Sequence, residues 1–202
     1  MNSLLLVPLN DSPAHFKSLC DLQTVFSQVC NTLAQLVQQS RCWNRVTLHH
    51  LAYKKLREAF PTLGSQMICN AIYSVSRTSR LVYQHPESPF NLSLLNGKPL
   101  PLLRFTNTCP VYFDRHTLSI KSGRLSMYTL EGRIRFNVAL RPEDETTFKQ
   151  SKLREVALSR NRVGNFELSF LFSMQSHVDE PSAAKAHDSG QIPEYVMIDE
   201  AP

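Results

Sequence analysis

The chain has 202 residues and a hydrophobic content of 42%, enough to bury the core of one good-sized domain or of two small ones. A formal net charge of +5 favours anionic partners, but 22 basic against 17 acidic residues is a mild excess that does not establish nucleic-acid binding by itself. The five cysteines are odd in number and at least ten residues apart, which fits neither a disulfide framework nor a CxxC zinc knuckle.

Residues 1–12 are predicted to contribute one strand. The apolar run Leu4–Leu9 is short, contains Pro8 and follows no basic residues, so it is neither a signal peptide nor a membrane span. We therefore expect a cytoplasmic protein without a membrane partner. Ser12 can cap a following helix, with Pro13 at the first helical position.

A helical bundle is predicted over residues 13–85. Its first helix carries an apolar stripe at steps of three and four residues, formed by Phe16, Leu19, Leu22, Phe26, Val29, Leu33 and Leu36. Amides cover much of the remaining surface, where they either contact nucleic acid or are solvated: Gln23, Gln28, Asn31, Gln35, Gln38 and Gln39. The break at Arg41–Arg45 places Trp43 between two arginines, where the indole either stacks on a base or fills a gap between helices.

Two further helices complete the predicted bundle, one over Thr47–Phe60 and one from Gly64-Ser65 to about Tyr83. Their apolar residues form inward stripes, and their outward faces carry basic and aromatic side chains. The candidates for nucleic-acid contacts are Lys54 and Arg57 on the second helix, with Tyr73, Arg77 and Arg80 on the third.

The second half of the chain changes character. Residues 86–103 are rich in proline and predict a linker, and Asn96-Gly97 favours a turn. Short alternating strands separated by glycine turns follow over 104–174 and predict an antiparallel barrel of OB-like type, with a short helix across it at Pro142–Gln150. Residues 175–202 predict a flexible tail that ends in the strand-like run Tyr195–Asp199. The fold class is therefore α+β.

The stretch Arg124–Leu140 predicts two strands joined at Glu131-Gly132. On the second strand, apolar residues alternate with Arg133 and Arg135, so one face seeks a core while the other offers guanidinium groups to an anion such as phosphate. We take Arg124, Arg133 and Arg135 as candidate nucleic-acid contacts.

Catalytic motifs are missing from the sequence. It contains no GxxxxGK[ST], GxGxxG, HExxH or GxSxG pattern. The cysteines lie in apolar surroundings and are interpreted as core residues, although a histidine brought close in space could still activate one. The run Glu143–Glu145 begins the short predicted helix, where its charges favour the helix dipole, and three consecutive helical residues cannot converge on one metal ion. We expect no catalytic residue, cofactor or metal site.

The order of the parts resembles a known family. The segments LHHLAYKKLREAFPTLGSQMICNAIYSVSRTSR, YFDRHTLSIKSGRLSMYTLEGRIRFNVAL and REVALSRNRVGNFELSFLFSM, preceded by an entering strand and a helix with Asn31 near its middle, resemble the N-terminal half of TnpB. TnpB is the transposon-encoded RNA-guided nuclease related to type V CRISPR effectors. The resemblance covers about residues 4–174 and rests on ordered weak patterns, such as the succession of residues from Tyr53 to Gln66 and the pair Gly132-Arg133.

The resemblance implies a wedge barrel interrupted by a helical recognition insert. It also implies a structured guide RNA bound by the barrel, and a guide:target DNA heteroduplex contacted by the helices through its backbone. In that family a RuvC-like domain holds two metal ions with three separated carboxylates. Tyr195–Asp199 resembles the first strand of that domain with its first carboxylate, but Glu200-Ala201-Pro202 replaces the usual glycine turn, and the other carboxylates and the zinc element are absent.

We therefore expect a guide-RNA-binding protein that resembles a truncated, nuclease-lacking TnpB and is not itself an enzyme. Two alternatives stay open. The chain could be the non-catalytic subunit of a split or multi-subunit RNA-guided nuclease, with a separate nuclease subunit as partner, or it could be a protein-interaction module without nucleic acid.

Overall fold

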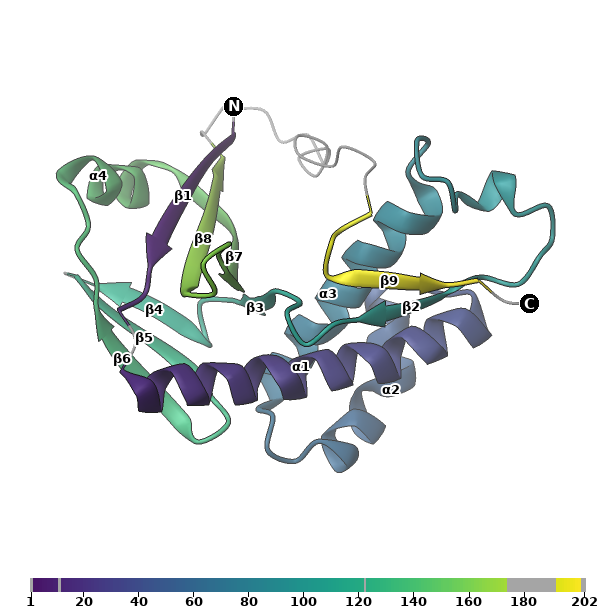
Figure 1. Cartoon of the computed structure of the whole chain (residues 1–202), viewed down its shortest axis with the longest axis horizontal. Helices are drawn as coiled ribbons and strands as arrows, with labels where there is room; N and C mark the ends of the chain where they lie inside the picture. The colour runs from purple at the N-terminus through teal and green to yellow at the C-terminus, as the bar shows by residue number, and fades with distance from the viewer. Residues whose placement is uncertain (1, 11, 122, 174–191, 201–202) are drawn as a thin grey trace. The chain divides into compact units, whose positions relative to one another are not determined.

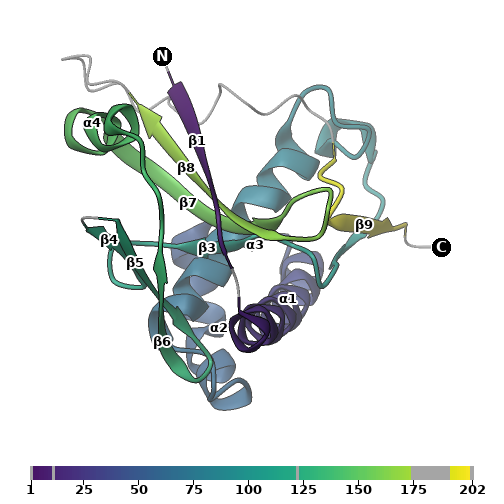
Figure 2. The same cartoon turned by 60° about the vertical axis from the view of Figure 1, so that its left-hand side comes forward.

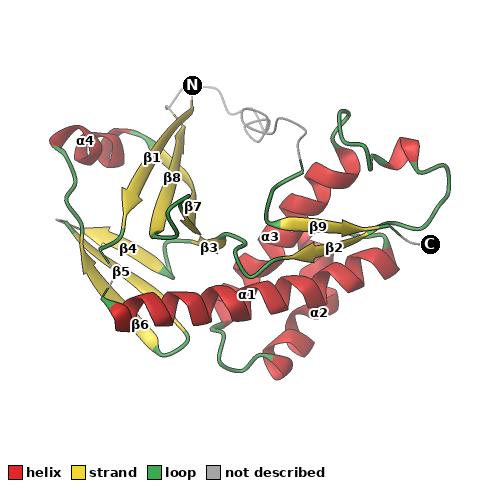
Figure 3. Ribbon diagram, in the orientation of Figure 1, coloured by secondary structure: helices red, strands yellow, loops and turns green. Residues whose placement is uncertain are grey.

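The computed structural model describes residues 2–10, 12–121, 123–173 and 192–200. These residues form four α-helices, one short 3-10 helix and nine strands, and every strand pairing is antiparallel (Figures 1 and 3). The α+β class with antiparallel sheets is thus confirmed. The chain divides into two compact units, which we call unit 1 (residues 1–22 and 110–186) and unit 2 (residues 23–109 and 187–202).

Unit 1 contains a four-stranded sheet that joins both ends of the unit's sequence. Its order is β1 (Asn2–Pro8), β8 (Phe166–Ser173), β7 (Lys152–Arg160) and β3 (Val111–Phe113), and β8 lies beside β1 in both views (Figures 1 and 2). Strand β8 alternates strictly, and its four phenylalanine and leucine side chains on one face are fully buried: Phe166, Leu168, Phe170 and Phe172. Burial of this face anchors the sheet and fixes its register.

A second, three-stranded sheet in unit 1 has the order β4 (Leu118–Lys121), β5 (Arg124–Thr129) and β6 (Gly132–Asn137). The β5–β6 turn contains Gly132 at φ 112°, a conformation that favours glycine. The hydroxyl of Thr129 donates to the Gly132 carbonyl at 2.9 Å and holds the turn closed. This turn sets which residues of the two strands face each other.

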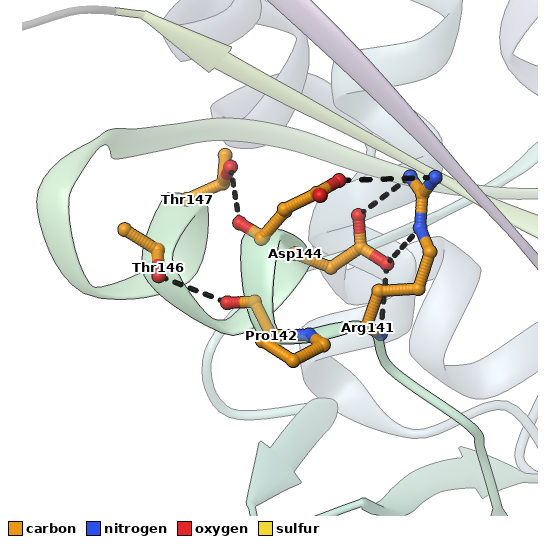
Figure 4. Close-up of polar contacts among 6 residues, drawn as sticks. Arg141, Pro142, Asp144, Thr146 and Thr147 are labelled. Carbon is orange, nitrogen blue, oxygen red and sulfur yellow. Dashed lines mark hydrogen bonds and ion pairs between the residues drawn. The ribbon is translucent and has the colours of Figure 1, made fainter.

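Helix α4 (Pro142–Gln150) begins with the acidic run singled out in the sequence. Asp144 accepts hydrogen bonds from the backbone N–H of Arg141 at 3.0 Å and from the Arg141 guanidinium at 3.1 and 3.0 Å (Figure 4). These hydrogen bonds from Arg141 lower the pKa of Asp144. The carboxylate therefore caps the start of the helix, where the sequence placed the acidic run. Further along the helix, Phe148 packs edge-on against Phe170, with ring centroids 5.1 Å apart.

Unit 2 is mainly helical. It contains the larger part of helix α1 (Pro13–Ser40), followed by α2 (Arg45–Ala59) and α3 (Ser65–Gln84), and it also holds a two-stranded sheet made of β2 (Leu102–Phe105) and β9 (Val196–Asp199). The 3-10 helix η1 (Leu92–Leu94) lies between α3 and β2. Asn44 caps α2 by accepting from the N–H groups of Val46 and Thr47.

Three amides of α1 bind the main chain that runs alongside it. The Gln23 side chain donates to the carbonyl of Cys109 at 3.0 Å, and the Gln38 side chain donates to that of Leu100 at 3.0 Å. Between them, Asn31 donates to the Phe105 carbonyl at 2.9 Å and accepts from the Phe105 N–H at 2.7 Å. Asn31 thereby makes the two hydrogen bonds to Phe105 that a neighbouring strand would make to β2. Together the three amides provide hydrogen-bond partners for backbone groups that face a helix rather than another strand.

The sequence left two interpretations of the amide-rich face open, nucleic-acid contact and solvation, and the structure adds a third role for half of the amides. Gln23, Asn31 and Gln38 are engaged within unit 2, while Gln28, Gln35 and Gln39 are exposed. The periodicity showed where the amides lie but not that a strand would run past them.

The other expectations have mixed outcomes. The helices agree with their predicted positions to within a few residues, strands β3 to β8 lie within the predicted strand region 104–174, β2 begins at Leu102 inside the predicted linker, and Val196–Asp199 is a strand. The ladders of the described residues form three open sheets, so a closed barrel is not confirmed, and the predicted domain boundaries stay a prediction. The flexible segment expected over residues 175–191 lies outside the described residues. Of the helices in the described ranges, none combines the length and apolarity needed to cross a bilayer.

Candidate nucleic-acid interface

The sheet β4–β5–β6 separates its side chains by chemistry. One face contributes buried apolar residues, among them Leu118, Leu125, Met127 and Phe136. The other face, which we call the basic sheet face, consists of alternate residues on all three strands: Ser119, Lys121, Arg124, Ser126, Tyr128, Arg133, Arg135 and Asn137. Strand residues of this face include four cations and no carboxylate.

The register places these side chains in three cross-strand rows. Arg124 lies between Lys121 and Asn137, and Ser126 lies between Ser119 and Arg135. In the third row Tyr128 lies opposite Arg133. Arg133 and Arg135 are two residues apart on one strand, about 6.8 Å, while Lys121 lies directly opposite Arg124 on the neighbouring strand, about 4.8 Å away, so positive charge is concentrated along the face.

Arg133 is the most constrained of the four cations. Its guanidinium donates to the His116 carbonyl at 2.7 Å and to the Ser126 hydroxyl at 3.2 Å, and its carbon lies 4.4 Å from the centre of the Tyr128 ring. The Tyr128 residue remains 41% exposed. Both side chains are thus held in place while presenting surface to solvent.

The cations of this face keep their charge available. Lys121, Arg124, Arg133 and Arg135 are all exposed, and none of them pairs with a carboxylate among the residues that the structure describes. An exposed cation without a carboxylate partner keeps its field unneutralised, and several on one face add their fields, although Arg133 already uses part of its guanidinium for the His116 carbonyl and the Ser126 hydroxyl. The arrangement is suited to an extended anion.

In unit 2, the structure contradicts the candidate role of Trp43 as a base-stacking residue and supports the alternative that it fills a gap between helices. The indole is only 9% exposed and packs against Tyr83, with ring centroids 5.3 Å apart. The Trp43 carbonyl also accepts from the Ser76 hydroxyl at 2.7 Å. A side chain this deeply packed cannot receive a base without unfolding its surroundings, so Trp43 is a core residue between helices.

The other unit 2 candidates differ in how free they are. Arg57 is half-buried, and its guanidinium donates to the Leu63 carbonyl, which ties the end of α2 to the turn that follows. Lys54 is exposed, and Arg80 is exposed with a long contact of 3.4 Å to the Ser76 hydroxyl. Tyr73 and Arg77 are half-buried on α3. Arg57 therefore has a structural role, whereas Lys54 and Arg80 remain available to a ligand.

Sequence reasoning missed several residues beside these candidates. The Arg45 guanidinium lies 5.4 Å from the centre of the Tyr73 ring, and His49 and Tyr53 stack at 4.6 Å on the same helix. The spacing of four residues between Arg45, His49 and Tyr53 was the available signal. Lys121 was also missed as a site residue. Its position in the alternation of β4 puts its side chain on the same sheet face as that of Arg124, and this could have been predicted.

Asp199 lies at the end of strand β9. Its carboxylate accepts from the Arg104 guanidinium on the neighbouring strand β2, and the Asp199 side chain is 44% exposed. Within the described ranges no group of three or more His, Cys, Asp or Glu residues is placed to hold a metal ion. In this structure Asp199 is engaged in a surface ion pair.

The remaining polar features offer little chemistry. Cys30 and Cys109 are fully buried, and burial raises the pKa of the Cys30 thiol well above its ordinary value, which disfavours the nucleophilic thiolate. An open hollow of about 590 Å³ in unit 1 is lined by Leu9, Asn10, Ser12, Pro13, Phe16 and Asn165. The Ser12 hydroxyl in this hollow already accepts a hydrogen bond from the backbone N–H of His15, at the start of α1.

No protein-family model and no curated protein matches this chain. Over its described residues, the fold and the site define it as an α+β protein with open antiparallel sheets. One of these sheets has a basic face whose cations pair with no carboxylate among those residues.

Proposed function

We propose that this protein binds structured RNA through the basic sheet face of β4–β5–β6. The observation that carries the proposal is the set of four exposed cations, free of carboxylate partners among the described residues, on the solvent side of a sheet whose other side is core. Phosphate neutralisation by Arg and Lys is the main sequence-independent source of nucleic-acid affinity. A face of this composition reads backbone charge.

The resemblance to TnpB makes the proposal more specific. The RNA is then a guide RNA, the sheets of unit 1 belong to a wedge-like barrel, and the helices form a recognition insert that contacts a guide:target DNA heteroduplex. The pairing of β1 with β8 supports an insert, because the chain leaves the four-stranded sheet after β1 and returns to it only with β3, β7 and β8. Lys54 and Arg80 are the helical cations best exposed for such a contact.

The salt dependence of binding tests the proposal. Each neutralised phosphate contributes about −0.7 to the slope of log K against log salt for single strands, so four cations predict a slope of about −2.8 from this face. Arg133→Glu with Arg135→Glu should weaken binding of a hairpin RNA with a single-stranded loop and flatten the slope by at least about 1.4.

A matched control is available in the same unit. Lys152→Glu with Arg162→Glu makes the same change in net charge at two exposed positions outside the basic sheet face, and it should alter the slope far less. Circular dichroism of both double variants verifies folding. An unchanged slope in Arg133→Glu/Arg135→Glu, with the fold intact, removes the basis of the proposal.

A further inference from the structure

Tyr128 and Arg133 form the one aromatic–guanidinium contact found on the basic sheet face among the described residues. They are direct cross-strand partners on β5 and β6, and the guanidinium carbon lies 4.4 Å from the ring centre. A cross-strand pair of this kind also stabilises its hairpin, by about 0.2–1 kcal/mol, so its existence alone does not indicate a ligand.

Two further observations indicate that the pair can contact a ligand. The Arg133 guanidinium is anchored by the His116 carbonyl and the Ser126 hydroxyl, so it is held over the ring even though it is exposed. Tyr128 keeps 41% of its surface exposed, whereas the residues beside it on β5, Met127 and Thr129, are buried on the other face. The pair is rigid and accessible at the same time.

The chemistry of such a pair selects its ligand. A nucleobase stacks well on an aromatic ring or on a guanidinium plane, and stacking is tolerant of base identity because every base has a π face. In an uninterrupted duplex the faces of the bases are covered by their neighbours, and only the phosphates, the sugars and the base edges can reach a sheet. An unpaired base is therefore the partner that can use both side chains.

The neighbouring side chains suit the nucleotides on either side of that base. Arg135 is two residues from Arg133 on β6, about 6.8 Å along the strand, and Arg124 lies one row beyond it on β5. Ser126 and Asn137 add neutral hydrogen-bonding groups between the cations. Cations next to a stacking position are the combination that single-strand-binding surfaces use.

We infer that the Tyr128–Arg133 pair is a stacking platform for an unpaired base, so that the basic sheet face takes a looped or single-stranded stretch of RNA in preference to an uninterrupted duplex. This inference rests on the proposed function and names the class of RNA that the same site binds.

The experiment compares two probes on the full chain at one salt concentration: a single-stranded RNA and a blunt RNA duplex of the same length. Tyr128→Leu keeps an apolar side chain at this position but removes the ring. It should lower affinity for the single strand roughly five- to hundred-fold and leave duplex affinity nearly unchanged. Tyr128→Phe retains the ring and should bind as the native protein does.

Arg133→Lys supplies an independent arm that does not alter the ring. Lysine keeps the charge but loses the planar group, so single-strand affinity should fall while the salt slope stays the same. This variant also decides the matter if Tyr128→Leu disturbs the hairpin, which its thermal melt would reveal.

The outcomes separate the two levels of the proposal. If the native protein binds the duplex as tightly as the single strand, or if Tyr128→Leu and Arg133→Lys leave single-strand affinity unchanged, the platform is refuted while RNA binding stands. An equal loss for both probes would make the pair a structural element of the hairpin and would also refute the platform. If the native protein binds neither probe, the proposed function itself fails.

Discussion

The double hydrogen bond between Asn31 and Phe105 allows a quantitative test of how unit 2 is held together. In Asn31→Ala the N–H and the carbonyl of Phe105 both lose their side-chain partner. The Phe105 residue is only 3% exposed, so water replaces these bonds poorly. An unsatisfied buried group costs about 1–3 kcal/mol, and Asn31 itself is half-buried, so we expect the free energy of unfolding to fall by about 2–4 kcal/mol.

Urea denaturation followed by tryptophan fluorescence measures this loss. Trp43 is the only tryptophan of the chain and lies in the same unit as Asn31, so its emission reports the relevant transition. With an m-value of about 2 kcal/mol per molar urea, the midpoint should fall by about 1–2 M. Gln35→Ala, an exposed amide on the same helix, is the control and should shift the midpoint little. A change below about 0.5 kcal/mol in Asn31→Ala would refute the view that this amide acts as a strand partner.

Two further predictions concern Trp43 and Asp144. Trp43→Ala should lower the free energy of unfolding by about 3–5 kcal/mol by circular dichroism in urea, while Trp43→Leu, which removes the aromatic ring, should leave the RNA affinity of the folded protein unchanged; a marked affinity loss in the folded Leu variant would restore the stacking role. The lowered pKa of Asp144 means that its bond to Arg141 stabilises the fold above the carboxyl's ordinary value of 3.8, and that this stabilisation is lost as pH falls through the lower folded-state value. Asp144→Asn should therefore lower the melting temperature at pH 7, and its melting temperature should fall less than that of the native protein as the pH is lowered. Glu143→Gln changes an exposed neighbouring carboxylate and is the control, because its melting temperature should fall with pH as the native one does.

The features that sequence predicted are those set by local chemistry. Alternation of apolar and polar residues placed β5 and β6 to within three residues, since β6 ends at Asn137 and not at Leu140, and Gly132 marked their turn. Proline and acidic residues marked the start of α4, and Arg133 and Arg135 are on the exposed face that their parity indicated. These signals act within one strand or one helical turn, so no knowledge of tertiary structure was needed.

The features that sequence missed depend on which segments meet. The role of Asn31 required β2 to pass along α1, a contact across 74 positions that no periodicity encodes. Burial of Trp43 depends on Tyr83 of α3 packing against it, and the pattern of an aromatic residue between two arginines left both a base-stacking and a gap-filling role open. The Tyr128–Arg133 contact could have been predicted from the sequence, because the register set by the turn at Gly132 pairs these two residues directly.

The register of the β5–β6 hairpin carries a consequence for how this surface can change over evolution. Core and exposed residues occupy opposite parities of the same three strands, so inserting or deleting one residue in a strand would exchange them and drive the arginines into the apolar interior. Point substitutions on the outer parity leave the interior intact. The chemistry of this exposed face can therefore change one side chain at a time, whereas length changes are tolerable only in the loops that flank the strands.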